Sequence, residues 1–308
     1  MTAFPSLQAF LEDARARIDE ALDLFLPKPP ACPAIVSEAM RYSVFAGGKR
    51  LRPCLTLATA DAIEQDSIDL ALPAACAIEL IHTYSLIHDD LPAMDDDQLR
   101  RGRPTLHVVY GEGIAILAGD GLHAEAFTLL ASAPAIHDPD TVARKLRVLQ
   151  VVGDAAGAAG MVGGQALDLQ AAGQARGHAI VLDAGGLRDM HARKTGALIR
   201  ASAVSGAIMA GGDEAMIEAI DRYAADLGLA FQIVDDILDV EGSAAELGKT
   251  AGKDASADKP TYPSLFGLEQ SRRMADEYLQ RAHKSLVDAG LTDGWLAAIA
   301  DWVVSRKS

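Results

Sequence analysis

Two clusters of aspartates are the part of the sequence that points most clearly to chemistry. The first contains Asp89, Asp90, Asp95, Asp96 and Asp97, and the second contains Asp235, Asp236 and Asp239. Four helical residues turn the chain by about 400°, so Asp235 and Asp239 should share one face, a turn apart. Pro92 should end the first helix near Leu91 and let Asp95 fold back toward Asp89.

Carboxylates without a neighbouring sulfur or imidazole ligand suit a hard cation. Neither cluster contains a histidine or cysteine, and Mg²⁺ is typically held by one or two carboxylates together with substrate phosphates. The alternative is that these residues are merely solvated near helix ends. Carboxylates at a helix C-terminus oppose the helix dipole by about 0.3–1 kcal/mol each, and a bound cation offsets that cost. Together, the two clusters favour a Mg²⁺ site.

Basic residues occur where a diphosphate group would need them. They are Lys49, Arg50 and Arg52 between Gly48 and Pro53, Arg100 and Arg101 after the first cluster, Lys194 in a long helical stretch, and Lys249 and Lys259 after the second cluster. Taken singly, each would more often be a surface charge, since lysine and arginine are mostly exposed. Their placement around both clusters favours phosphate binding instead.

Helices can account for almost the whole chain. Apolar residues recur at intervals of three and four from Leu7 to Phe25, with Ser6 as the expected N-cap. Further helices are expected at about 33–45, 51–64, 70–91, 112–131, 140–170, 186–211, 213–240, 261–289 and 293–305. No stretch shows the alternation typical of strands. We predict an all-α fold in a single large domain over residues 1–308, with functional loops at about 92–110 and 241–260.

Composition narrows the classes of function. The net charge of -15 argues against a nucleic-acid or anionic-membrane partner. No run reaches the roughly 18 uninterrupted apolar residues of a membrane span, and the N-terminus does not resemble a secretory signal. The three cysteines form no CxxC pair and are typical of reduced core residues. These features predict a cytoplasmic protein without membrane insertion.

From about Tyr42 to Glu269 the chain resembles the trans-prenyl diphosphate synthases, most closely the bacterial farnesyl diphosphate synthases. The resemblance rests on the two aspartate clusters and on the motifs at 47–53, 100–102 and 194–196. It implies the isoprenoid synthase fold, in which antiparallel helices surround a central cavity, and a homodimer. It also implies three Mg²⁺ ions, with Mn²⁺ as a substitute, and these metal ligands: Asp89, Asp90, Asp95, Asp235, Asp236 and Asp239.

The resemblance also implies roles for other residues. Isopentenyl diphosphate would be bound by Lys49, Arg52, His82 and Arg101. The allylic diphosphate would be bound by Arg100, Lys194, Lys249 and Lys259, close to Gln165 and Asp168. Thr195 and Gln232 would face the developing carbocation, whereas His88 has no assigned role. The implied reaction joins dimethylallyl or geranyl diphosphate to isopentenyl diphosphate and releases farnesyl diphosphate and pyrophosphate.

Product length is expected to depend on Tyr84 and Ser85, which precede Asp89 by five and four residues. In the resembling family, these positions and an expanded first motif often shorten the product, which favours C15. The alternative for Tyr84 is an ordinary half-buried helix tyrosine, and a C20 geranylgeranyl product is the main rival. A class I terpene cyclase would usually have asparagine in its second metal motif, and this chain contains none. A non-catalytic partner subunit would lack one cluster or the basic residues, and both are present.

Overall fold

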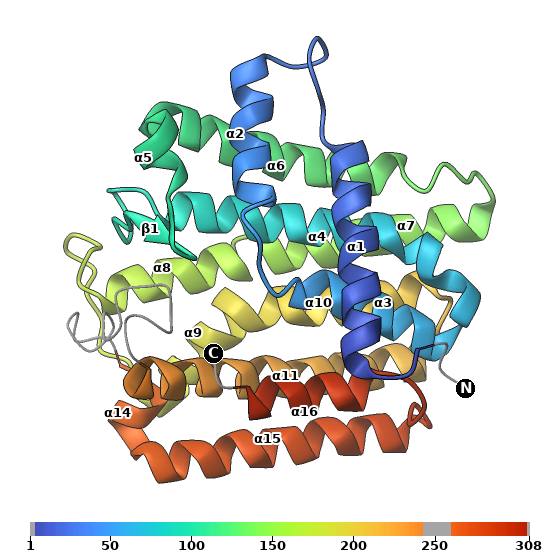
Figure 1. Cartoon of the computed structure of the whole chain (residues 1–308). Coiled ribbons are helices and arrows are strands. Elements are labelled where there is room, and N and C mark those ends of the chain that lie inside the picture. Colours follow the sequence, from blue (N-terminus) through green and yellow to red (C-terminus); the bar gives the residue numbers. More distant parts are fainter. Residues whose placement is uncertain (1–3, 243–259, 307–308) are drawn as a thin grey trace.

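The computed structural model describes residues 4–242 and 260–306. Figure 1 shows that these residues are almost wholly helical, so the all-α prediction is confirmed. The helices are α1 (Leu7–Phe25), α2 (Ala34–Val44), α3 (Leu51–Ile63), α4 (Ile68–Asp89), α5 (Leu106–Tyr110), α6 (Glu112–Ser132), α7 (Pro139–Ala156), α8 (Met161–Ala171), α9 (Ala184–His191), α10 (Ala197–Met209), α11 (Glu214–Glu241), α14 (Tyr262–Phe266), α15 (Leu268–Asp288) and α16 (Leu296–Ser305). A 3₁₀ turn, η1 (Gln65–Ser67), precedes α4, and a π-helical turn, η2 (Ala192–Gly196), joins α9 to α10.

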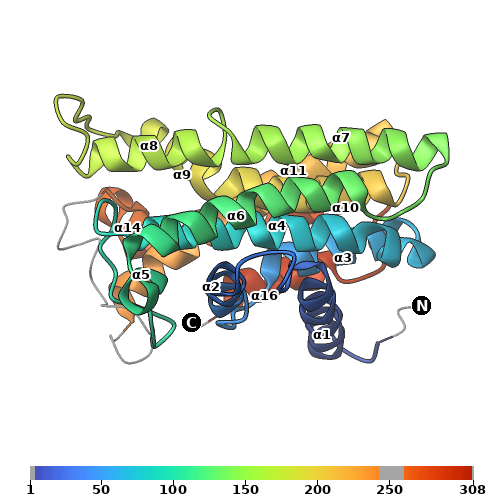
Figure 2. The ribbon, with the colours of Figure 1, turned by 90° about the horizontal axis from the view of Figure 1, so that it is seen from above.

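Most of the long helices run side by side. In Figure 1, α4, α6, α10, α11 and α15 run across the view, and α1 and α2 cross them. Seen from above, α7 and α8 lie along one edge, and α1, α2 and α16 lie toward the opposite edge (Figure 2). Helix α4 lies between these edges and packs against α3, α6 and α10. The C-terminal ends of α4 and α11, which carry the aspartate clusters, lie on the same side of the molecule (Figure 1).

Helix α4 is apolar on all sides and passes through the core. Ile78, Leu80 and Ile81 are buried, because a helix without a polar face must be covered by its neighbours. By length and composition, α6 and the stretch from η1 through α4 are the two described segments that could cross a membrane. That criterion alone is weak evidence, and the apolar window of the η1–α4 segment is 72% buried within the structure. The window of α6 is only 39% buried, so this helix has an exposed apolar face.

The sequence predicted some helix ends correctly, but apolar periodicity concealed two breaks within predicted helices. Ser6 caps α1 as predicted, and its hydroxyl accepts a hydrogen bond from Ala9 N at 3.2 Å. The prediction of one helix over 140–170 was wrong, because the chain breaks between α7 and α8. A Cβ on Gly160 would lie 2.1 Å from Ala155 O, so only glycine fits this bend. The predicted helix over 261–289 is likewise interrupted at Gly267, where φ is +79°.

A small hairpin contradicts the prediction that no strands are needed. Strand β1 (Leu99–Arg100) pairs antiparallel with β2 (Arg103–Pro104). The turn between them places Arg101 and Gly102 at positive φ, as two-residue hairpins require. Two-residue strands are too short to show periodicity in the sequence. Because the two strands are paired, Arg100 and Arg101 lie in a hydrogen-bonded hairpin.

Candidate active site

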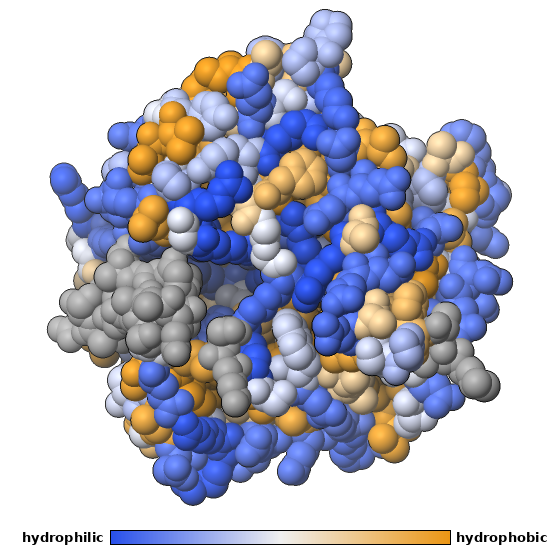
Figure 3. All heavy atoms as spheres, in the orientation of Figure 1, coloured by the Kyte–Doolittle hydropathy of each residue, from blue (hydrophilic) through white to orange (hydrophobic). Residues whose placement is uncertain are grey.

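Both aspartate clusters line one cavity, which has a volume of about 660 Å³. Figure 3 shows a hollow bordered by hydrophilic residues near the centre of one face. The predicted site residues in the cavity lining are Lys49, Arg52, His82, Asp89, Asp95, Arg100, Arg101, Asp168, Lys194, Thr195, Gln232, Asp235, Asp236 and Asp239. The fold therefore brings together residues from α3, α4, the β1–β2 hairpin, α8, η2 and α11.

The first cluster turns back on itself, as predicted from Pro92. Helix α4 ends at Asp89, and Asp95 N then donates a hydrogen bond to Asp89 O at 2.9 Å. Asp97 N donates to Asp90 O at 3.1 Å, and Asp96 between them has a φ of +52°. The carboxylates of Asp89, Asp95 and Asp97 thus border the same cavity. Sequence reasoning did not assign Asp97, although its place in the run of aspartates was a signal.

Lys194 connects the first cluster to α8. Its Nζ lies 2.6 Å from Asp168 Oδ2 and 3.8 Å from Asp89 Oδ2. Burial lowers the pKa of Lys194, but the carboxylates of Asp89 and Asp168 outweigh this effect and raise its pKa. Gln165 Nε2 donates to Asp89 Oδ1 at 2.5 Å. Burial raises the pKa of Asp89, although Lys194 opposes that rise. A permanent cation therefore stands beside the first cluster.

An irregular backbone turn sets the position of Lys194. It lies in η2, a single π-helical turn of the kind often found at functional sites. Gly164 of α8 packs directly against this turn, and a Cβ at position 164 would lie 2.2 Å from Lys194 N. Glycine at 164 therefore allows α8 to pack closely against η2. A larger residue at 164 would push α8 away from the turn.

Asp90 and Arg100 are bound to each other. Arg100 Nε donates to Asp90 Oδ1 at 2.8 Å, and Arg100 Nη2 donates to the same oxygen at 2.6 Å. Asp90 is buried and does not belong to the cavity lining, whereas Arg100 does. Burial raises the pKa of Asp90, and the hydrogen bond from Arg100 lowers it. In this geometry Asp90 orients the guanidinium of Arg100.

The second cluster is held by residues from distant segments. Asp235 Oδ1 lies 2.7 Å from Arg306 Nη2, whose guanidinium also lies over the Phe231 ring. Asp236 Oδ2 accepts a hydrogen bond from Tyr262 N at 2.9 Å, and its Oδ1 accepts one from Gln232 at 3.2 Å. These contacts hold the cluster from α14 and from the end of the described chain. The sequence offered no local signal for the Arg306 contact, because 70 residues separate the partners.

His191 is a further cavity residue that sequence reasoning missed. It is buried, its ring stacks with Tyr262 at 5.7 Å between centroids, and Nε2 lies 3.8 Å from Asp236 Oδ2. Burial lowers the pKa of His191 to about 4. The imidazole is therefore neutral at physiological pH. Its position three residues before Lys194 was the only signal in the sequence.

The four predicted isopentenyl diphosphate ligands line the cavity near one another, since the charge of Arg101 acts on each of the other three. We call this group the isopentenyl end: Lys49, Arg52, His82 and Arg101. Arg52 Nε is buried and has no hydrogen-bond partner within the described part of the chain. Burial and the nearby arginines lower the pKa of His82 well below its usual value, so it is neutral. Buried cationic donors of this kind fit an anionic ligand.

We expect Lys49→Ala and Arg52→Ala each to raise the KM for isopentenyl diphosphate about ten-fold or more. Each change removes a charge-assisted hydrogen bond, which is worth roughly 1.5–3 kcal/mol. Initial rates at varied isopentenyl and geranyl diphosphate concentrations give both KM values. Arg103→Ala is the control for loss of a positive charge, because Arg103 lies in the hairpin that carries Arg101 but not in the cavity lining. A larger rise in the allylic KM would mean that the two diphosphate ends are reversed.

Some predicted residues lie elsewhere. Lys249 and Lys259 are outside the described residues. Tyr84 and Ser85 do not belong to the cavity lining, nor does Gln165, which reaches the site only through Asp89. The His88 ring fills the space above Gly119 and its Nε2 lies 3.2 Å from Ile116 O, so it packs α4 against α6.

The donor set fits Mg²⁺ better than a softer metal. Among the residues that the structure describes, no three histidine, cysteine or carboxylate side chains form a group that could hold an ion alone. Asp89 at the end of α4, Asp95 in the turn after it, and Asp235 and Asp239 of α11 instead border one cavity. Mg²⁺ retains waters and takes its remaining ligands from substrate phosphates, so carboxylates around a single cavity fit this metal.

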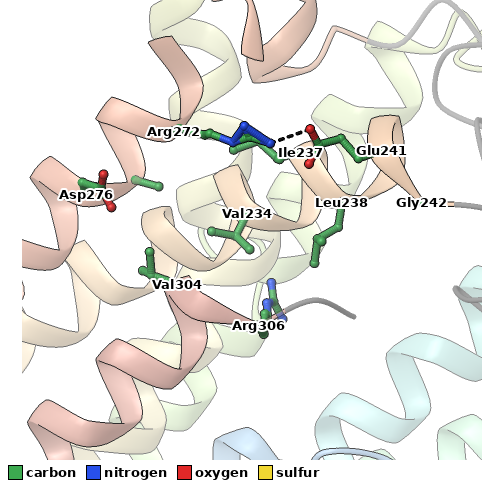
Figure 4. A pocket seen from close by; sticks show the side chains of 10 residues that line it. Val234, Ile237, Leu238, Glu241, Gly242, Arg272, Asp276, Val304 and Arg306 are labelled. Carbon is green, nitrogen blue, oxygen red and sulfur yellow. Dashed lines mark hydrogen bonds and ion pairs between the residues drawn. The ribbon is translucent and has the colours of Figure 1, made fainter. Parts of the chain in front are cut away.

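A second cavity of about 420 Å³ lies next to the first, between α11, α15 and α16. Figure 4 shows its apolar side chains from α11 and the ion pair between Arg272 and Glu241 at its rim. Arg306 borders both cavities. The larger cavity, which holds the aspartates and the basic residues, is the candidate active site.

Comparison with known proteins agrees with this geometry. Residues 33–289 match the family model described as polyprenyl synthetase. The chain belongs to the polyprenyl synthetase family. It is 46% identical over 303 residues to farnesyl diphosphate synthase of Escherichia coli, covering 96% of this chain and 98% of that protein. It is also 45% identical over 293 residues to geranylgeranyl pyrophosphate synthase 7 of Arabidopsis thaliana, covering 94% and 81%.

A solved structure extends the agreement to the fold. The polyprenyl synthetase described here superimposes with a TM-score of 0.82, at 31% identity, on a geranyltransferase of Helicobacter pylori complexed with magnesium and isoprenyl diphosphate. The match covers 99% of this chain and 98% of that one. The predicted isoprenoid synthase fold is therefore confirmed. The protein is a prenyltransferase of the trans-prenyl synthase type, whose general activity condenses an allylic diphosphate with isopentenyl diphosphate.

Proposed function

We propose that this polyprenyl synthetase is a cytoplasmic, Mg²⁺-dependent farnesyl diphosphate synthase. It would condense dimethylallyl or geranyl diphosphate with isopentenyl diphosphate and release pyrophosphate. The observation that carries the proposal is that both aspartate clusters and two groups of cations line one cavity.

Product analysis tests this proposal. Incubation of the protein with geranyl diphosphate, isopentenyl diphosphate and Mg²⁺ should yield a product that chromatography identifies, after dephosphorylation, as a C15 alcohol. A C20 alcohol as the main product would overturn the C15 assignment and leave the prenyltransferase standing.

The cavity residues divide between the two diphosphates. Lys194 and Arg100 are the cations beside the first cluster and would bind the allylic diphosphate. Three Mg²⁺ ions bound with the substrate would neutralise charge on the leaving diphosphate. Lys49 and Arg52 would hold isopentenyl diphosphate at the other end. Positioning of this kind and stabilisation of developing charge are the main sources of rate enhancement in such reactions.

The bond changes follow from this arrangement. The allylic C–O bond breaks and its electron pair leaves with the diphosphate. The double bond of isopentenyl diphosphate then attacks the allylic carbon to form the new C–C bond, and a proton is lost to the released diphosphate. Thr195 and Gln232 also border the cavity, and their side-chain oxygens would stabilise the positive charge.

Tyr84 supports a product of C15 length. Its side chain is 8% exposed and its ring lies 4.7 Å from that of His123 on α6, measured between centroids. The two rings are tilted by 33° and pack between α4 and α6. Tyr84 precedes Asp89 by five residues on α4. Tyr84 lies outside the lining of the cavity, so a hydrocarbon tail that grows down α4 from a diphosphate near Asp89 would reach this pair, about 7.5 Å along the helix, by extending beyond that lining. The ring pair would then act as the floor that stops elongation.

We expect Tyr84→Ala to shift the main product from C15 to C20 or longer while turnover stays within about three-fold. Removing the ring opens space beside His123, and further isopentenyl units can then be added. Chromatography of the dephosphorylated products gives the distribution. Tyr278→Ala on α15 is the control, because it removes a partly buried tyrosine far from α4. An active Tyr84 variant with an unchanged C15 product would show that the floor lies elsewhere.

An exposed apolar face supports the expected homodimer. Leu117 on α6, Leu146 on α7 and Val162 on α8 are each at least half exposed. Apolar side chains gathered in this way mark surfaces that another protein covers. A second copy of this chain would cover them across a two-fold axis.

Sedimentation analysis of the wild-type protein should give about twice the mass of one chain. The double variant Leu117→Glu with Leu146→Glu should give the mass of a single chain.

A further inference from the structure

A buried ion pair between Arg50 and Glu79 lies in the wall of the cavity, beside the isopentenyl end, and has no role in the mechanism above. Arg50 Nη1 lies 2.8 Å from Glu79 Oε1, and each side chain is 4% exposed. Arg50 Nη2 also donates to Val44 O, and Nε donates to Asp19 Oδ1 at 3.1 Å. The guanidinium therefore ties the start of α3 to α1, α2 and α4. Burying two charges carries a desolvation cost that often cancels their attraction, so stability alone is a weak reason for this pair.

The pair anchors the turn that presents the predicted isopentenyl ligands. Arg50 is the residue before α3 and has a φ of +50°, a left-handed conformation that is rare for arginine. Lys49 precedes it, and Arg52 follows two residues later in the first turn of α3. Both line the cavity. Arg50, which lies between them, has the strained backbone and is held by three hydrogen-bonding partners. Its conformation sets the direction in which Lys49 and Arg52 point.

Glu79 connects this turn to the helix of the first aspartate cluster. It lies on α4, one turn before His82 and ten residues before Asp89, which corresponds to about 15 Å along the helix. Both His82, which belongs to the isopentenyl end, and Asp89 of the first aspartate cluster line the cavity. Helix α4 therefore carries both Glu79, which holds the turn at the isopentenyl end, and Asp89, a predicted metal ligand of the allylic diphosphate site.

We propose that the Arg50–Glu79 pair is a positioning device for isopentenyl diphosphate. It holds the turn at 47–52 against α4 so that Lys49 and Arg52 address the same diphosphate group. Neither partner needs to contact the substrate. The inference rests on the proposed function and adds to it a pair of residues that set the affinity for one of the two substrates.

The test uses single and double variants of the full chain. Glu79→Gln removes the buried counterion of Arg50 and leaves only Asp19, whose side chain is 48% exposed, so we expect a lower Tm and a roughly ten-fold higher KM for isopentenyl diphosphate. The KM for geranyl diphosphate and kcat should change less than about two-fold. The double variant Glu79→Gln with Arg50→Met removes the unpaired charge, so the Tm should recover. Its KM for isopentenyl diphosphate should stay high, because the anchor is still missing.

A control separates positioning from general destabilisation. Asp226 on α11 is buried and its Oδ1 lies 2.9 Å from Arg281 Nη2, and neither residue lines the active-site cavity. Asp226→Asn should lower the Tm and leave both KM values unchanged. Calorimetric titration with inorganic pyrophosphate gives a readout without turnover, and binding should weaken in the double variant but not in Asp226→Asn.

The outcomes are distinct. The inference is overturned if the KM of the double variant returns to the wild-type value together with its Tm, or if both KM values rise equally. In either case the proposed function stands. If the wild-type chain forms no condensation product from geranyl and isopentenyl diphosphates, the proposed function fails and the inference fails with it.

Discussion

Replacing Asp89 or Asp235 by asparagine is expected to lower kcat for condensation by about 1,000-fold, which corresponds to about 4 kcal/mol of transition-state stabilisation. The two residues border the cavity from α4 and α11. Asparagine has nearly the same shape but lacks the charge that, in the proposed mechanism, would hold Mg²⁺. Without the metal, the leaving diphosphate keeps its negative charge and the allylic C–O bond ionises slowly. Steady-state rates at saturating substrates and varied Mg²⁺ give the measurement.

Asp96→Asn provides the matched control for this loss. Asp96 belongs to the same cluster but is exposed and lies outside the cavity lining, and asparagine tolerates its positive φ. Burial raises the pKa of Asp89, which means that the fold disfavours its ionised form. Asp89→Asn should therefore keep a wild-type Tm while it loses activity. Equal rates for Asp89→Asn and Asp96→Asn would contradict a metal role for the first cluster.

Lys194→Met is expected to lower kcat by about 100- to 1,000-fold. This is the usual cost of removing one pre-oriented group that stabilises developing charge. Lys194 is held by Asp168 and stands 3.8 Å from Asp89, so its ammonium is fixed before substrate binds. Single-turnover rates with saturating geranyl diphosphate isolate the chemical step. The KM for isopentenyl diphosphate should change little, because Lys194 lies at the other end of the cavity.

The structural cost of this substitution can be separated from the catalytic one. Lys194→Met removes the cation that lies 2.6 Å from the buried carboxylate of Asp168, which should lower the Tm. Adding Asp168→Asn removes the carboxylate charge and should restore the Tm but not kcat. Lys284→Met is a control for loss of a lysine, because Lys284 forms an exposed pair with Asp288 on α15. If both kcat and the Tm of the double variant recovered, Lys194 would have only a structural role.

Local sequence rules were sufficient where chemistry depends on neighbours along the chain. The i, i+4 spacing placed Asp235 and Asp239 on one face of α11, and Pro92 correctly predicted the turn that returns Asp95 to Asp89. The type and approximate position of most helices followed from apolar periodicity. The break at Gly160 was missed because periodicity continues across it, whereas the bend depends on a close contact with Ala155.

Contacts between distant segments were beyond the reach of sequence patterns. Arg306 reaches Asp235 only because α16 packs beside α11. The pairing of Asp90 with Arg100 depends on a hairpin too short to show alternation. Glu79 did carry a signal, since it is a charge within an apolar helix, but its partner Arg50 could not be inferred without the fold. Such residues become visible only when the helices are assembled.

The most direct test of the proposed mechanism is the stoichiometry of condensation with and without divalent metal. The purified full chain, stripped with a chelator, is incubated with geranyl diphosphate and labelled isopentenyl diphosphate, and both labelled prenyl product and pyrophosphate are measured. We predict almost no product without metal. Added Mg²⁺ should restore turnover, with one pyrophosphate released for each isopentenyl unit incorporated. Comparable product formation in the metal-free and Mg²⁺-supplied enzyme would contradict the role assigned here to the two aspartate clusters.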